Sequence, residues 1–247
     1  YVATTAFSDT LYVSGVYNGY NDTTPSHRAR LPSFVSLSFS SSQEELIGFA
    51  LDLEQGVFMK RSSVGDAQSV VQQSVYAHRK RRNVFVNSFC LLNANGASSV
   101  SLNISTNMGG NSNDITQIVT SNVSPGVVQS TFQTTEAESF LTTTTRLCVI
   151  ADAVPQSPIV LSQASPCALF VTATVTSLDV SVDRYKSVAL LEYQRAQSAG
   201  VSGLLLEHTA EWAALAPTSR ISLYSSDLRL KQVIYSSFYY ILSSVRN

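Results

Sequence analysis

The spacing of apolar residues changes once along this chain, near Leu178. Before that point apolar and polar residues alternate in short runs, as in 35–39 (VSLSF) and 100–104 (VSLNI), and such alternation is typical of half-buried β-strands. After it, apolar residues recur at helical spacing over 183–199, and Gly200 follows as a helix stop signal. The change of period predicts strands first and helices last.

Turn signals separate the strand-like runs in the first part of the chain. Gly56 lies in a short turn between two apolar runs, and the basic cluster 79–83 separates two more. Many short strands joined in this way are typical of an antiparallel sandwich. We therefore predict a mainly β fold, with a large antiparallel β-sandwich over residues 1–178 and a helical region over 179–247.

The last predicted helix is more apolar than a surface helix requires. Three helices are expected, over 183–199, 203–215 and 226–245. The third carries apolar residues on well over a third of its circumference. Exposing them would leave an apolar surface patch that favours association with other chains. We expect its far side to pack against another polypeptide through Phe238, Ile241 and Leu242.

Charge and hydropathy exclude two classes of partner. The net charge is −1 and only 13% of residues are charged, so there is no basic excess to hold a nucleic-acid backbone. No run of 18 or more apolar residues occurs, so we predict no membrane span. Hydrophobic residues make up 44% of the chain, enough for a substantial core.

Three cysteines occur, and an odd number does not form a complete disulfide framework. They are Cys90, Cys148 and Cys167, without a CxxC pair that would suggest zinc, and we predict no metal site. Cys148 and Cys167 are a disulfide candidate if adjacent strands bring them together. The alternative is three buried thiols.

Three glycosylation sequons begin at Asn21, Asn103 and Asn122. Sequences rich in Ser and Thr produce such triplets by chance, and Pro125 directly after the third should weaken it. Together with the low Lys content, the sequons favour a secreted, lysosomal or otherwise extracellular location.

Acid/base and phosphate-binding patterns are weak in this chain. Asp52 and Glu54 lie on a predicted hairpin and Glu136 and Glu138 in a polar loop, so we interpret both pairs as surface charge. No G-x-S-x-G elbow occurs, and the glycine pair at 109–110 lacks the helix that a phosphate loop needs. We predict no catalytic residue and no cofactor.

The histidines and the basic cluster have structural explanations as well as functional ones. His208 and Trp212 are four residues apart on one helix face, which suits an anchor between helix and sandwich. His78 ends a predicted strand and is expected to face solvent or a backbone acceptor. The cluster 79–82 (RKRR) is interpreted as a solvated hairpin tip, and a site for an anionic glycan or an acidic patch remains the alternative.

Six short motifs, in order along almost the whole chain, resemble the N-terminal region of glycoside hydrolase family 65. The similarity is greatest to the branch containing acid trehalase and protein-glucosylgalactosylhydroxylysine glucosidase. The motifs are 7–19 (FSDTLYVSGVYNG), 27–32 (HRARLP), 49–53 (FALDL), 73–79 (QSVYAHR), 208–213 (HTAEWA) and 238–244 (FYYILSS).

The resemblance implies a galactose-mutarotase-like supersandwich joined by linker helices to an (α/α)6 barrel that would begin where this chain stops. The barrel carries the family's general acid, so no catalytic residue is transferred to this chain. Tyr17, Asn18, His27 and Arg28 would border the sugar pocket of the adjacent barrel. The alternative is that this segment packs only against its own sandwich.

Three functions follow from these observations. The first is a non-catalytic domain that supports and orients the barrel of an inverting α-glucoside hydrolase, with that barrel as partner. The second is an extracellular structural or assembly protein derived from the family, without catalysis. The third, a free carbohydrate-binding module, ranks last because no line of aromatic residues stands out.

Overall fold

Strands occupy the first three quarters of the fold and two helices follow. The structure is a computed structural model that describes residues 2–3, 10–19, 25–65, 69–93, 99–110, 112–138, 141, 143–215 and 223–244. The strands are β1 (Val2–Ala3), β2 (Thr10–Tyr12), β3 (Tyr17–Asn18), β4 (His27–Arg28), β5 (Leu31–Pro32), β6 (Leu37–Ser40), β7 (Glu45–Asp52), β8 (Val57–Val64), β9 (Ser69–Ala77), β10 (Val84–Asn93), β11 (Ser99–Thr106), β12 (Ile115–Ser124), β13 (Val127–Thr134), β14 (Arg146–Asp152), β15 (Ile159–Ser162) and β16 (Cys167–Thr176).

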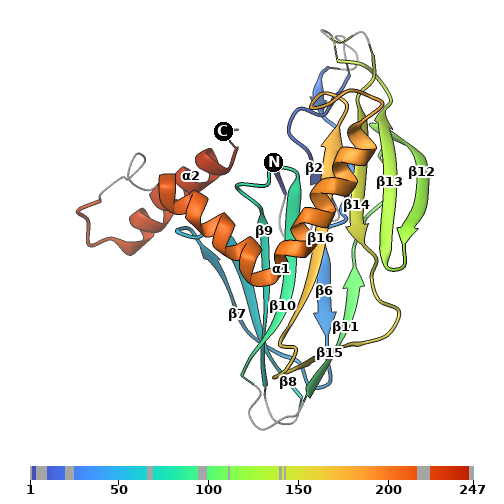
Figure 1. The fold of residues 1–247 in the computed structure, drawn as a ribbon. Coiled ribbons are helices and arrows are strands. Elements are labelled where there is room, and N and C mark those ends of the chain that lie inside the picture. The colour runs from blue at the N-terminus through green and yellow to red at the C-terminus, as the bar shows by residue number, and fades with distance from the viewer. Residues whose placement is uncertain are drawn as a thin grey trace.

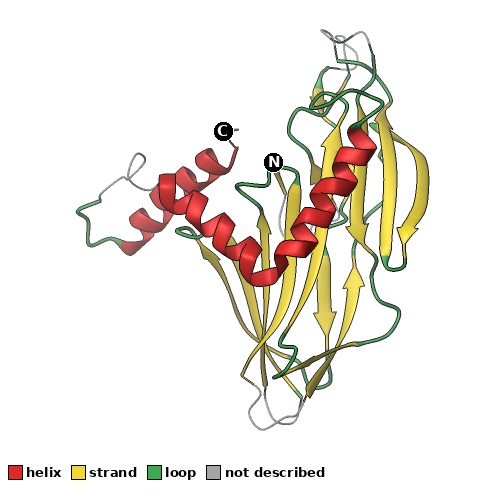
Figure 2. Cartoon of the chain, in the orientation of Figure 1, coloured by secondary structure: helices red, strands yellow, loops and turns green. Residues whose placement is uncertain are grey.

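One large sheet organises the molecule (Figure 2). Its eight strands run in the order β12-β13-β14-β16-β10-β9-β8-β7, and each neighbouring pair is antiparallel. The sheets β15-β11-β6 and β1-β2-β5 cover one face, and helix α1 (Tyr185–Leu215) lies on the other (Figure 1). The predicted fold class, a large antiparallel sandwich followed by helices, is confirmed.

The central strands are buried on both faces, because α1 and the small sheets sandwich the large sheet. In β14, Cys148 and Ile150 belong to the core beneath α1, while Leu147 and Val149 pack toward β2 and β5. A strand of this kind needs a continuous apolar run, and LCVIA at 147–151 provides it. Phe89 and Leu102 lie in a third core between β10 and β11.

Helix α1 bends sharply at Gly200. The sequence predicted a helix stop there, and the structure places Gly200 at φ 65° and ψ 177° between two helical segments. A positive φ strains any residue with a Cβ, so glycine suits this position. The bend directs the first segment along β14 and β16 and the second toward β7 and helix α2 (Leu228–Ser244) (Figure 1).

A buried carboxylate fastens the first segment of α1 to the sheet. Asp152 ends β14 and accepts hydrogen bonds from the Tyr193 hydroxyl (2.5 Å), the Gln197 amide (2.6 Å) and the backbone N–H of Val171 (2.6 Å). Burial raises the pKa of Asp152 above its ordinary value, and these three donors oppose that shift. Asp152 therefore connects α1, β14 and β16.

The candidate Cys148–Cys167 disulfide is wrong, and so is the alternative of three buried thiols. The two cysteines do lie on adjacent strands, but the register places Cys148 opposite Val175. Cys167 lies at the other end of β16, directly opposite Cys90 of β10, and those two are bonded with Cα atoms 4.1 Å apart. Cys148 is a buried free thiol whose pKa burial raises to about 12.

Neither described helix combines the length and the apolar character needed to cross a bilayer.

Candidate functional site

The four residues predicted to border a sugar pocket meet in one short ladder. Strand β3 pairs antiparallel with β4, so Tyr17 lies opposite Arg28 and Asn18 lies opposite His27. His27 and Arg28 are exposed, Tyr17 is half-buried and Asn18 is buried. The ladder therefore presents an imidazole and a guanidinium to solvent on a backbone that Asn18 secures from beneath.

Asn18 is held by a loop 117 residues away. Its Oδ1 accepts hydrogen bonds from the Thr135 hydroxyl (3.1 Å) and from the backbone N–H of Glu136 (2.8 Å). Both of these donors follow β13. The carboxyl groups of Glu136 and Glu138, expected to be surface charge, are half-buried beside this ladder, and Glu138 accepts a hydrogen bond from Ser26.

Asp114 orients His27. One carboxylate oxygen lies 2.9 Å from His27 Nε2, and the other accepts the backbone N–H of Arg30 at 2.9 Å. His27 Nδ1 lies 2.8 Å from the carbonyl of Pro25, so acceptors face both ring nitrogens. The hydrogen bond to Asp114, followed by that to Pro25, raises the pKa of His27. This favours an exposed imidazolium, whose two N–H groups both donate within the fold and whose positive charge faces solvent.

A second polar cluster joins α1 to two hairpins of the large sheet. His78, at the end of β9, accepts the backbone N–H of Arg81 on Nδ1 and donates from Nε2 to the carbonyl of Leu204 (3.0 Å each). His208 in α1 accepts the N–H of Arg79 on Nδ1 (3.0 Å) and donates to the carbonyl of Gly56 (3.3 Å). Each buried ring is therefore neutral, accepting a hydrogen bond on Nδ1 and donating one from Nε2.

Burial governs the protonation of this cluster, which we call the histidine junction (His78, His208 and their partners). Desolvation lowers the pKa of each imidazole to about 4. The rings lie 5.6 Å apart between centroids, so charging one further disfavours charging the other. The predicted anchoring role of His208 and Trp212 agrees with these contacts.

The basic cluster 79–82 is not a solvated hairpin tip, because two of its side chains hold the helices. Arg81 makes a bidentate pair with Glu207 of α1, at 2.7 and 2.9 Å. Arg79 donates to the carbonyl of Leu242 in α2 at 2.8 Å, and its guanidinium lies over the Trp212 ring at 5.2 Å. Trp212 in turn stacks on Tyr239 with centroids 5.4 Å apart.

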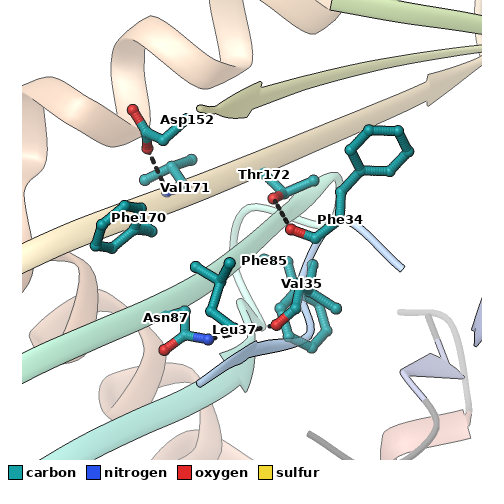
Figure 3. A pocket seen from close by; sticks show the side chains of 9 residues that line it. All are labelled: Phe34, Val35, Leu37, Phe85, Asn87, Asp152, Phe170, Val171 and Thr172. Carbon is teal, nitrogen blue, oxygen red and sulfur yellow. Dashed lines mark hydrogen bonds between the residues drawn. The ribbon is translucent and has the colours of Figure 1, made fainter. Parts of the chain in front are cut away.

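A small cavity lies between the large sheet and the segment that leads into β6 (Figure 3). It has a volume of about 10 Å³, close to the minimum for one water molecule. Asn87 donates to the carbonyl of Val35 at its edge, and Thr172 donates to the carbonyl of Phe34. These bonds fasten the crossing segment, and the cavity is too small for a sugar ring.

Other predicted residues have clear positions. Asn103 and Asn122 are exposed on strands β11 and β12, whereas Asn21 lies outside the described residues. On α2, Ile241 is 58% exposed and Phe238 and Leu242 are half-buried, so the described part of the chain leaves this face incompletely covered. Among the described residues, no group of three or more His, Cys, Asp or Glu could hold a metal ion.

Sequence reasoning missed Asp114, Asp152 and Glu207 as partners of the sites. Each acts on a residue at least 41 positions away, and nothing in its local sequence indicates that partner. A single carboxylate after a strand or on a helix face is common, so only the fold reveals these pairs.

Comparison with known proteins bears on the resemblance. No protein-family model matches the chain. The protein-glucosylgalactosylhydroxylysine glucosidase of Dictyostelium discoideum is 29% identical over an alignment that covers all of this chain. The resemblance to glycoside hydrolase family 65 is confirmed. This family-65-like chain spans only 35% of that relative.

A solved structure shows the same fold. A protein assigned as a kojibiose phosphorylase, from the human microbiome, matches with a TM-score of 0.63 and 12% identity. The match covers 93% of the family-65-like chain and 34% of the solved one. At this identity the likeness concerns the fold alone.

Proposed function

We propose that this chain is the non-catalytic N-terminal part of a longer enzyme that cleaves α-glucosides, and that it supports and orients an (α/α)6 barrel. The observation that carries the proposal is the coverage: all of the chain aligns with about a third of a glucosidase. The two thirds of that relative beyond the alignment leave room for a barrel with the catalytic acid. Such an acid would work opposite a second group across the glycosidic bond.

The uncovered face of α2 is where we place the barrel. Exposed apolar and aromatic side chains gather on this helix, namely Leu228, Leu230, Val233, Tyr240 and Ile241. Fully burying one such side chain contributes about 1.5–3 kcal/mol, so a covering domain would gain considerably. The histidine junction holds the second segment of α1 on the sandwich. Arg79 and the Trp212–Tyr239 stack hold α2 beside it, which would fix the orientation of whatever packs on α2.

The reading frame beyond Asn247 and the activity of its product test this proposal. We expect the frame to encode a barrel, and the full-length protein to release glucose from glucosyl-galactose, trehalose or kojibiose. The 247-residue chain alone should release none. A stop codon directly after Asn247, or turnover by the short chain, would contradict the proposal.

Docking is tested separately by pull-down of the downstream segment. Val233→Ser with Ile241→Ser should weaken its capture by this chain. Val160→Ser is the matched control, because Val160 is 57% exposed but lies in β15, on the small sheet that covers the face of the large sheet opposite α1. Equal loss in both variants would show that α2 is not the docking face.

We also propose that the β3–β4 ladder borders the sugar pocket of that barrel. In its support, His27 and Arg28 are exposed basic side chains on a ladder that hydrogen bonds of Asn18 and Asp114 hold in place. In the full-length enzyme, Arg28→Ala should raise KM with little change in kcat, whereas Arg82→Ala should leave both unchanged. Unaltered kinetics for Arg28→Ala would place the ladder away from the pocket.

An assembly protein without catalysis is the second candidate, and strand β7 favours it. Leu46, Ile47 and Phe49 are exposed on this edge strand of the large sheet. An exposed apolar edge is a template for pairing with another chain. Sedimentation of the purified chain would distinguish the two. An assembly protein should self-associate through β7 and lose that association in the Ile47→Lys variant. An isolated support domain should not self-associate through this strand.

We propose an extracellular or lysosomal location. The Cys90–Cys167 disulfide supports it, since such bonds persist in oxidising compartments. Fractionation followed by thiol labelling tests it, and a cytosolic, fully reduced protein would overturn it.

A further inference from the structure

The strands of one small sheet contain no charged residue. The sheet β15-β11-β6 lies behind the large sheet, and its inward residues, including Leu37, Leu102 and Leu161, form a core with it. None of the 16 residues of these three strands is charged. Natural edge strands are normally protected by charge, by short length or by a covering group. Here the two edge strands, β15 and β6, lack the first of these protections.

Asn103 lies in the centre of this uncharged face. Strand β11 is the middle strand, and its residues alternate between exposed and buried, with Asn103 and Ser105 on the exposed side. Their cross-strand partners are Ser40 and Ser38, and the hydroxyls of Ser38 and Ser105 are 2.8 Å apart. On the β6 side of Asn103 the outward side chains are therefore small hydroxyls, which leave room above its amide, and the outward side chain on β15 is the exposed Val160.

We infer that Asn103 carries an N-linked glycan that covers the outer face of the small sheet. Asn103-Ile-Ser105 is a sequon, and both of its functional side chains point to solvent in the folded chain. A glycan here displaces no packed residue. The Cys90–Cys167 disulfide independently suits an oxidising compartment, where this modification occurs.

The chemistry is a transfer from a polyprenyl-diphosphate-linked oligosaccharide, catalysed by an oligosaccharyltransferase. The Nδ2 atom of Asn103 forms a bond to C1 of the first sugar, and the bond from C1 to the phosphate oxygen breaks. The polyprenyl diphosphate leaves with the electron pair, and the amide proton passes to a base of the transferase. No oxidant or reductant is needed.

The structure distinguishes Asn103 from the second described sequon. Asn122 is also exposed, but a β-bulge falls between Asn122 and Ser124 on the edge strand β12. Pro125 follows directly and restricts the backbone of Ser124. Asn122 therefore serves as the control within the same chain.

The glycan also fits the proposed docking geometry. The small sheet and α1 lie on opposite faces of the large sheet (Figure 1), so a glycan on β11 leaves the helical side free. Coverage of one face and docking on the other are compatible in one molecule.

The test expresses the chain behind a secretion signal in a eukaryotic host and maps each site by peptide-N-glycosidase treatment in H₂¹⁸O. We expect the Asn103 peptide to gain the ¹⁸O-labelled aspartate in most molecules and the Asn122 peptide to gain little. Asn103→Gln and Ser105→Ala should each remove the same mass shift, while Ser105→Thr should keep it and Asn122→Gln should change nothing. An unmodified Asn103 in chain recovered from the secretory pathway would overturn the inference.

Discussion

Gly56 lies directly against the indole ring of Trp212. A Cβ built on Gly56 would lie 2.3 Å from Trp212 Nε1 and 2.5 Å from Cε2, and the residue has φ +67°. The turn between β7 and β8 and the second segment of α1 meet here without room for a methyl group. The same turn supplies the Gly56 carbonyl that accepts the His208 hydrogen bond, so one glycine serves two contacts.

Gly56→Ala should therefore separate α1 from this turn. We expect a loss of about 2–4 kcal/mol in the free energy of unfolding, from steric overlap and backbone strain together. Trp212 is the only tryptophan, so its fluorescence should report a more exposed ring. Gly126→Ala is the matched control, because Gly126 has φ +77° with nothing within 4 Å of a built Cβ. It should cost only about 1 kcal/mol, and equal losses in both variants would contradict the close packing.

The histidine junction should make the fold sensitive to acid. Burial lowers the folded pKa of His78 and of His208 to about 4, below the ordinary value of 6.5. The unfolded chain therefore binds more protons between pH 6.5 and 4, and the stabilisation present above pH 6.5 is lost as the pH falls through that range. The loss is on the order of 3 kcal/mol per imidazole.

Urea denaturation at several pH values measures this dependence. His78→Gln with His208→Gln keeps a donor and an acceptor at each position but cannot be protonated, so its stability should vary less between pH 6.5 and 4. His27→Gln is the control, since His27 is exposed and its pKa is raised rather than lowered. An unchanged pH slope in the double variant would refute the assignment.

The Arg81–Glu207 pair should contribute measurably to holding α1. Both side chains are partly buried and the pair is bidentate, which favours a larger contribution than an exposed pair makes. Glu207→Gln should lower the free energy of unfolding by about 1 kcal/mol. Arg195→Gln on the same helix breaks an i,i+3 pair with Glu192, and because the Arg195 side chain is 59% exposed it should have no measurable effect. Thermal denaturation of the two variants compares them directly.

We expect Cys90 and Cys167 to be linked by the disulfide and the buried thiol of Cys148 to be unreactive in the native chain. Alkylation of the native chain should label no cysteine, and denaturation without reduction should expose one thiol, on Cys148. Cys90→Ser should cost about 2–5 kcal/mol, because the bond closes a loop with a sequence separation of 77. Peptide mapping that linked Cys148 to Cys167 would overturn this pairing.

Local sequence patterns determined the kind of structure that this protein forms. The alternation in 100–104 indicated a half-buried strand, and Gly200 marked the end of a helical segment. These features depend on neighbours within a few residues, so periodicity and turn chemistry suffice to predict them.

Only the tertiary structure decided which distant residues meet. Cys148 and Cys167 do lie on neighbouring strands, yet the register of β10 and β16 assigns the bond to Cys90. Likewise His78 lies near His208 because the bend at Gly200 brings the second segment of α1 over the β9–β10 hairpin. Register and helix direction follow from the packing of the whole core, in which a shift of one residue reverses every side chain of a strand, and no local pattern records that choice.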